Sequence, residues 1–179
     1  ARQLGDCWVK NTLSFAQVTL ATSRLQTIAR EFEQLYIGSI NSGAAGPEIM
    51  VISPKGEQHT FGAQMICRQF KRLGAFPYLS IDNSLPEIKK IISEHKFELV
   101  GLSLADYKLC SKHGEVRTII KFIKKLKIPI IAGGSLIRSQ KNIVKSLGVD
   151  MITNDAASVL RYLDLNFATN KESLDLMTN

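Results

Sequence analysis

The sequence predicts an α/β fold in which a doubly wound sheet of five parallel strands follows a small N-terminal helical cap. From Glu48 onward, short apolar runs alternate five times with amphipathic segments of helix length, as is typical of parallel sheets covered by helices. Before that point, apolar residues recur at helical spacing. We therefore expect a helical cap over residues 1–46, an α/β domain over 47–166 and a C-terminal tail over 167–179.

The cap is expected to be helical from its start. Residues 4–11 predict a short helix, and Ser14 with Gln17 three positions later predicts the capping box of a longer one. Residues 38–47 are rich in Gly, Ser and Ala and predict a linker. The apolar stripe of the long helix comprises Phe15, Val18, Leu25, Ile28, Phe32 and Leu35.

The α/β part contains residues that are typical of helix starts and helix ends. Ser84 ahead of Pro86 and Glu87 is typical of a helix start, and Gly74 is typical of a helix stop. The predicted strands are 48–52, 76–81, 97–103, 128–133 and 149–153, and the predicted helices are 60–73, the segment from Ser84, 112–126, 139–147 and 156–163.

Three loops of this fold carry the residues with binding chemistry. In the flavodoxin-like strand order 2-1-3-4-5, strands 1, 3 and 4 are neighbours, and ligands bind outside the carboxyl ends of such strands. The text "GEQHTFG" (56–62) follows the first strand, "SLADY" (103–107) the third and "GGS" (133–135) the fourth. We expect the three loops to meet at one edge of the sheet.

The residue types in these loops favour a metal-containing ligand. His59 offers an imidazole, the commonest transition-metal ligand in proteins, and Glu57 can accept the other ring N–H. Ser103 offers a hydroxyl, while Gly133 and Gly134 let a flat group lie against backbone. The chain has no GxGxxG after the first strand, no phosphate-binding P-loop and no cluster of zinc ligands. One histidine with open space around it therefore suits a metal held in its own macrocycle.

Plainer interpretations exist for each of these positions. His59 can be a loop histidine without a ligand, the glycine pair can serve only a tight turn, and Ser103 can cap a backbone group. His113 can be a second ligand or a surface residue. Cys110 can be a redox or haem-binding residue or a buried thiol.

The same motifs resemble those of cobalamin-binding domains. "EQHTFG" (57–62) resembles their DxHxxG motif with Glu in place of Asp, "SLA" (103–105) resembles SxL with Ala in place of Leu, and "IIAGGS" (130–135) matches their GG segment. The resemblance implies a Rossmann-like cobalamin-binding domain in which His59 is the lower axial ligand of cobalt. It also implies that the displaced dimethylbenzimidazole tail lies beside Ser103 and the glycine pair. The implied site residues are Glu57, Gln58, His59, Thr60, Gly62, Ser103, Leu104, Gly133 and Gly134.

The helical segment 4–26 resembles the cap of cobalamin photoreceptors and corrinoid methyl carriers. Trp8 matches the Trp of those caps and is implied to cover the cofactor, although it can also be a core residue of a helical bundle. Val18 and Thr19 stand where the Glu-His pair of those caps would be. As a whole, the chain is most similar to the antirepressors of photosynthesis genes in purple bacteria (AerR and PpaA). It is also similar to the related domain of the flavin photoreceptor AppA, which makes haem the alternative cofactor.

Three functional classes follow from this. The first is a light-, redox- or ligand-responsive sensor that acts on a protein partner, a transcription repressor. The second is a corrinoid carrier or mutase component, and the third is a flavodoxin-like domain without a cofactor. We expect the regulator and not an enzyme, because Asp106 and Tyr107 are the only other proton-handling groups predicted near the site, without a second base opposite them.

Composition limits the remaining possibilities. The net charge is +7, but the lysines of 121–127 alternate with apolar residues and predict a solvated helix face more than a nucleic-acid contact. Without a helix-turn-helix pattern, direct nucleic-acid binding is not expected. The longest apolar runs are too short to span a membrane. The three cysteines are scattered, which is typical of a reducing, cytoplasmic environment.

Overall fold

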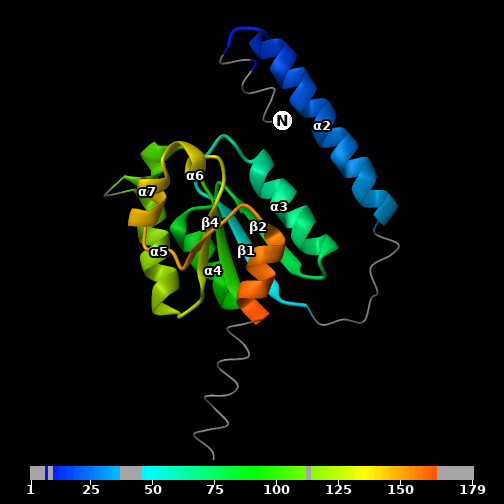
Figure 1. Ribbon diagram of the computed structural model, residues 1–179. Helices are drawn as coiled ribbons and strands as arrows, with labels where there is room; N and C mark the ends of the chain where they lie inside the picture. The colour runs from blue at the N-terminus through cyan, green and yellow to red at the C-terminus, as the bar shows by residue number, and fades with distance from the viewer. Residues whose placement is uncertain (1–6, 8–9, 37–45, 112–113, 165–179) are drawn as a thin grey trace, which may run out of the picture. The chain divides into compact units, whose positions relative to one another are not determined.

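The computed structural model describes residues 7, 10–36, 46–111 and 114–164, and the chain divides into two compact units, residues 1–43 and 44–179 (Figure 1). Trp8, His113 and the predicted tail over 167–179 lie outside the described residues. In the first unit, helix α2 spans Phe15–Tyr36. The amide of Ser14 donates to Gln17 Oε1 at 2.8 Å and the amide of Gln17 donates to Ser14 Oγ at 3.3 Å, so the predicted capping box forms.

The second unit contains a parallel sheet of the predicted order. All neighbouring strands pair in parallel, in the order β2-β1-β3-β4-β5, which confirms the fold class predicted from the alternation of apolar runs. The strands are β1 (Glu48–Ser53), β2 (Phe76–Ile81), β3 (Leu99–Ser103), β4 (Ile130–Gly133) and β5 (Met151–Ile152).

Helices cover both faces of this sheet (Figure 1). Alternate residues of β1 point to opposite sides: Met50 and Ile52 join one buried apolar cluster, and Ile49 and Val51 join the other. The first cluster includes residues of α4, α5 and α7, and the second includes residues of α3 and of the last helix, 156–164. The helix bounds are α3 (Phe61–Arg72), α4 (Leu85–Glu94), α5 (Glu115–Lys125), α6 (Leu136–Ser139) and α7 (Lys141–Ser146).

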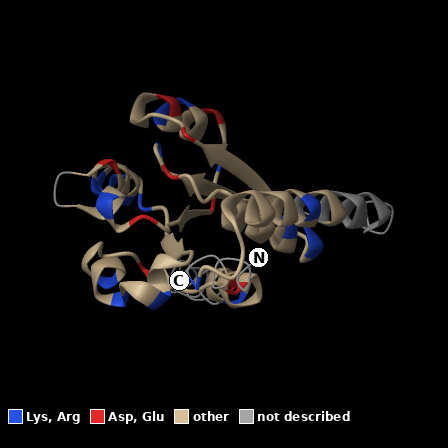
Figure 2. Ribbon diagram, turned by 90° about the horizontal axis from the view of Figure 1, so that it is seen from above, with Lys and Arg blue, Asp and Glu red and all other residues tan. Residues whose placement is uncertain are grey.

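Helix α5 explains much of the positive charge. Its inward side chains are fully or almost fully buried, whereas the lysines between them are exposed. Figure 2 shows Lys and Arg on the helices that surround the sheet. This arrangement agrees with a solvated helix face. The buried residues of α5 are Val116, Ile119, Ile120 and Ile123.

The structure differs from prediction in two connections. The helix expected over 139–147 is α7, which begins at Lys141, and a separate short helix, α6, precedes it; Gln140 between them has a φ of −144° and a ψ of 50°, outside the helical region. A 3₁₀ turn, η2 (Tyr107–Cys110), precedes α5 and was not expected; the side chain of Asp106 accepts from the amide of Lys108 and starts it. In the part of the chain that is described, no helix is both long and apolar enough to cross a membrane.

Candidate cofactor site

The loop after β1 is held against the end of β2. Glu57 donates its amide to the carbonyl of Pro54 at 3.0 Å, and Gly56 adopts a φ of 81°, which closes a tight turn. The amide of Gly56 donates to Asp82 Oδ1 at 3.0 Å, while the amide of Asp82 donates to the carbonyl of Ser53 at 3.2 Å. These bonds fix the backbone that presents Glu57 to the interior.

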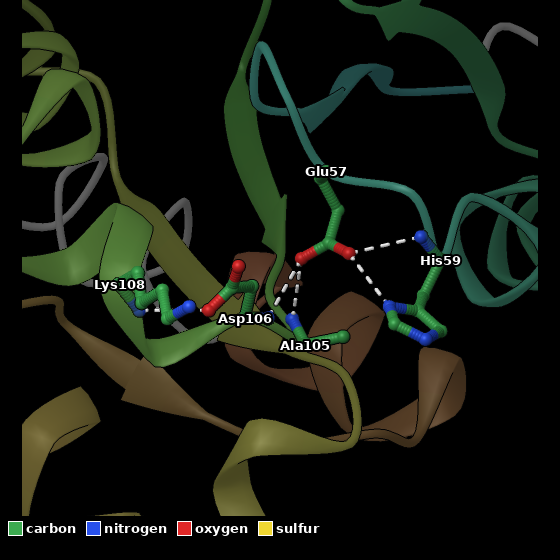
Figure 3. Close-up of polar contacts among 5 residues, drawn as sticks. All are labelled: Glu57, His59, Ala105, Asp106 and Lys108. Atoms are coloured by element: carbon green, nitrogen blue, oxygen red, sulfur yellow. Dashed lines mark hydrogen bonds and ion pairs between the residues drawn. The ribbon is translucent and has the colours of Figure 1, made fainter.

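The carboxylate of Glu57 joins the loops after β1 and β3 (Figure 3). Its Oε1 accepts from the amide of His59 at 2.9 Å and lies 3.0 Å from His59 Nδ1. Its Oε2 accepts from the amides of Ala105 and Asp106, both at 2.9 Å. The Glu57 side chain has no exposed surface, so the four contacts replace the water that an ionised carboxylate needs.

These contacts decide the ionisation of Glu57. Burial raises the pKa of the carboxyl, but hydrogen bonds from the amides of His59, Asp106 and Ala105, together with the His59 ring, outweigh burial and hold the pKa below its usual value. Glu57 is therefore an anion at neutral pH, and it accepts hydrogen bonds only.

His59 is oriented at one nitrogen and open at the other. Because an ionised Glu57 can only accept, Nδ1 of His59 carries the ring proton and Nε2 of the neutral ring keeps its lone pair. The side chain is 75% exposed, and in Figure 3 the second ring nitrogen points away from Glu57. This is the arrangement of an imidazole prepared to ligate a metal through Nε2.

The loops after β3 and β4 lie directly against each other. The amide of Leu104 donates to the carbonyl of Gly133 at 2.9 Å, and the amide of Leu136 donates to the carbonyl of Leu104 at 3.1 Å. Gly134 has a φ of 106°, and a Cβ there would lie 2.7 Å from the amide nitrogen of Leu104. The turn therefore requires glycine at 134 whatever else it binds, which supports the plainer interpretation of that residue.

Two serines end neighbouring strands of the sheet. Ser103, 8% exposed, lies beneath the start of α3, since a Cβ on Gly62 would be 3.8 Å from its Oγ. Ser53 has no exposed surface, and its Oγ has no hydrogen-bond partner in the structure as described. Our sequence reasoning missed Ser53, although a serine that ends the apolar run "EIMVIS" could have indicated it.

Other predicted positions have different surroundings. Leu104 is fully buried in the apolar cluster of α4, α5 and α7, so only its backbone reaches this edge. Gln58 is exposed, and Thr60 precedes α3 without a side-chain cap bond. Cys110 is buried, and burial raises the pKa of its thiol to about 11, so the thiol is protonated at neutral pH.

Metal binding by protein side chains alone has no support at this edge. Within the residues that the structure describes, no group of three or more His, Cys, Asp or Glu side chains could hold a metal ion. Among the described residues at this edge, His59 is the histidine that could ligate a metal, and the candidate second ligand His113 lies outside them.

Comparisons with known proteins identify relatives of the fold. No protein-family model matches the chain. It is 27% identical, over 92% of its length and 86% of the relative's, to an uncharacterized 20.5 kDa protein from the bchF-crtJ intergenic region of Rhodobacter capsulatus.

Two solved structures share the architecture. One is a cobalamin-binding protein from Desulfitobacterium hafniense, with a TM-score of 0.55, 20% identity and 66% of this chain covered. The other is the methanol:cobalamin methyltransferase complex MtaBC from Methanosarcina barkeri, with a TM-score of 0.57, 14% identity and 92% of this chain covered. The chain spans 57% and 63% of the lengths of these two chains. The fold is thus the Rossmann-like α/β fold that these cobalamin proteins share.

Proposed function

We propose that this protein binds a cobalamin through Nε2 of His59 and acts as a regulator of a transcription repressor, an antirepressor, and not as an enzyme. The observation that carries the proposal is the exposed imidazole of His59, fixed at Nδ1 by a buried, fully hydrogen-bonded Glu57. A carboxylate in that place orients a histidine and raises its basicity as a metal ligand.

The residues at the edge of the sheet fit such a group. Cobalamin supplies a cobalt ion whose axial ligands and oxidation state can change. His59 would hold the cobalt from one side, and Glu57 would keep the ring proton on Nδ1. Ser103 would offer a hydrogen bond to the nucleotide tail, and Gly62 places no side chain over its hydroxyl.

The regulatory part of the proposal rests on the sequence and on one relative. The sequence resembles photosynthesis-gene antirepressors, and the Rhodobacter capsulatus relative is named for its place between bchF and crtJ, which is consistent with that resemblance. The polar groups near His59 also favour binding over catalysis. Asp106, for example, uses Oδ1 to accept from the amide of Lys108 and thereby starts the turn η2.

Absorption spectroscopy tests the proposal. The purified protein is mixed with hydroxocobalamin and, separately, with haem, and each mixture is passed over a desalting column. We expect corrinoid bands to remain with the protein, and their positions to change in His59→Ala but not in His95→Ala, which removes a histidine at the other end of β1. If the protein retains haem, seen by its Soret band, and does not retain the corrinoid, then haem and not cobalamin is its cofactor.

The regulatory role is tested with the same loaded protein. Binding to a candidate repressor is measured in the dark and under illumination, and again after reduction. We expect the affinity to differ between two cofactor states, because a sensor needs a surface that changes with its ligand. Equal affinity in all states, together with methyl transfer from a supplied donor, would support the corrinoid carrier instead.

A further inference from the structure

Ser53 is a buried polar residue that the fold leaves unsatisfied. It has no exposed surface, and its hydroxyl finds no hydrogen-bond partner in the structure as described. Ser80, which is equally buried on the neighbouring strand β2, accepts a hydrogen bond from Asn83 Nδ2 at 3.0 Å. An unpaired buried hydroxyl destabilises the folded state, so its presence calls for a specific reason.

The strand geometry places Ser53 beside Ser103. In β1 it follows the alternation of Ile49 and Val51, so its side chain faces the layer formed by α3 and helix 156–164. The parallel register pairs Ile52 with Leu102, so Ser53 comes next to Ser103 at the carboxyl ends of the strands. Two hydroxyls therefore lie side by side on one face.

This face is the one over which the proposed ligand would enter. The chain leaves β1 at Ser53 and reaches Glu57 and His59 within six residues, and α3 starts directly after them. On the face that α3 covers, β1 and β3 end in Ser53 and Ser103, the strand-end residues from which the chain continues into the loops of His59 and Ala105. On the opposite face, the position after Ser103 is Leu104, which is packed in the apolar cluster.

We infer that Ser53 is a specificity-determining residue whose hydroxyl hydrogen-bonds to a ring nitrogen or sugar oxygen of the ligand's nucleotide tail. The inference rests on the proposed function and extends it from Ser103, which the sequence motif indicates, to a residue that no motif indicates. It adds a second hydroxyl for the nucleotide tail that the resemblance implies, a group that a tailless corrinoid and haem both lack.

The test compares one variant in two assays. Dissociation constants for hydroxocobalamin and for tailless cobinamide are measured by absorption titration, and thermal unfolding is measured on the unloaded protein. In Ser53→Ala, we expect cobalamin to bind about tenfold more weakly, cobinamide to bind unchanged, and the unloaded protein to unfold at a temperature at least as high as wild type. The melting result follows because the substitution removes the unpaired hydroxyl and little volume.

Ser80→Ala is the matched control. It removes a buried serine hydroxyl from the other face of the sheet, where Ser80 is in register with Ile52, and with it the hydrogen bond from Asn83 Nδ2. We expect a lower unfolding temperature and unchanged affinity for both corrinoids. Ser53→Ala should thus weaken cobalamin binding without lowering the unfolding temperature, and Ser80→Ala should do the reverse.

The remaining outcomes overturn the inference in distinguishable ways. Unchanged cobalamin binding in Ser53→Ala, or equal weakening for cobalamin and cobinamide, would mean that Ser53 does not contact the tail, while His59 ligation stands. A lower unfolding temperature of unloaded Ser53→Ala would give the hydroxyl a structural role instead. If wild type binds neither corrinoid, the proposed function fails together with this inference.

Discussion

At the scale of single residues, the site depends on the charge of Glu57. One carboxylate accepts from three backbone amides and faces the ring of His59, so it connects a loop after β1 with a loop after β3. Glu57 orients His59 through the 3.0 Å contact between Oε1 and Nδ1. The longer Glu in place of the Asp of the DxHxxG motif still reaches both loops.

Replacing Glu57 with Gln should destabilise the fold. The amide removes the charge and turns an N–H group toward other donors, so we expect a loss of about 1–3 kcal/mol at neutral pH, measured by urea unfolding. Because the folded pKa of Glu57 is lowered, its stabilisation is complete above the ordinary Glu pKa and is lost as the pH falls through the folded value. The difference between wild type and variant should therefore shrink below about pH 4.

The control for this experiment is Glu94→Gln. Glu94 is exposed and approaches only Lys90, at 4.0 Å, on the same helix, so its substitution should leave stability nearly unchanged. A Glu57→Gln difference that stays constant down to strongly acidic pH would show that the carboxylate is not ionised in the folded protein.

At the scale of elements, glycine in the turn from β4 into α6 has two possible causes, a binding role and the backbone geometry of the turn. The GG segment predicts a place for a cofactor tail, yet the positive φ of Gly134 and the close approach of Leu104 already require glycine there. The motif alone could not separate the two causes, because both favour the same residue.

Gly134→Ala should therefore destabilise the unloaded protein. We expect strain from the positive φ of about 1–3 kcal/mol, with a further loss because the new Cβ meets the backbone of Leu104. Gly74→Ala is the control, since Gly74 has a φ of 86° but no atom within 4 Å of an added Cβ. In urea unfolding, Gly134→Ala should have a clearly lower free energy of unfolding than Gly74→Ala. Equal losses would mean that the contact with Leu104, after β3, does not constrain the turn.

The sequence predicted regular elements better than connections. Alternating apolar runs predicted the strands, and Ser84 with Glu87 predicted the start of α4, where the amide and hydroxyl of Ser84 both donate to Glu87. Those patterns are local. The missing partner of Ser53 depends on how distant segments pack around the end of β1, which no local pattern records. The non-helical dihedral angles of Gln140 have no signal in the local sequence.

At the scale of the whole molecule, the candidate site is a consequence of strand order. Because β1 lies next to β3, and β3 next to β4, the loop after β3 contacts Glu57 through the amide of Ala105 and Gly133 through the amide of Leu104, although these segments are far apart in sequence. The strand order could be predicted, and so could the meeting of these loops. The binding roles of the site residues and the covering of the cofactor by the helical cap stay predictions.

Electron paramagnetic resonance of the cobalamin-loaded protein, reduced to Co(II), tests the central claim that His59 ligates the metal most directly. The splitting from an axial nitrogen is recorded with unlabelled protein and with protein carrying ¹⁵N-histidine. We predict that the triplet of unlabelled protein becomes a doublet on labelling, also in His95→Ala, and that His59→Ala loses the doublet. A triplet that labelling leaves unchanged would show that cobalt keeps its own base as ligand, and would contradict the claim.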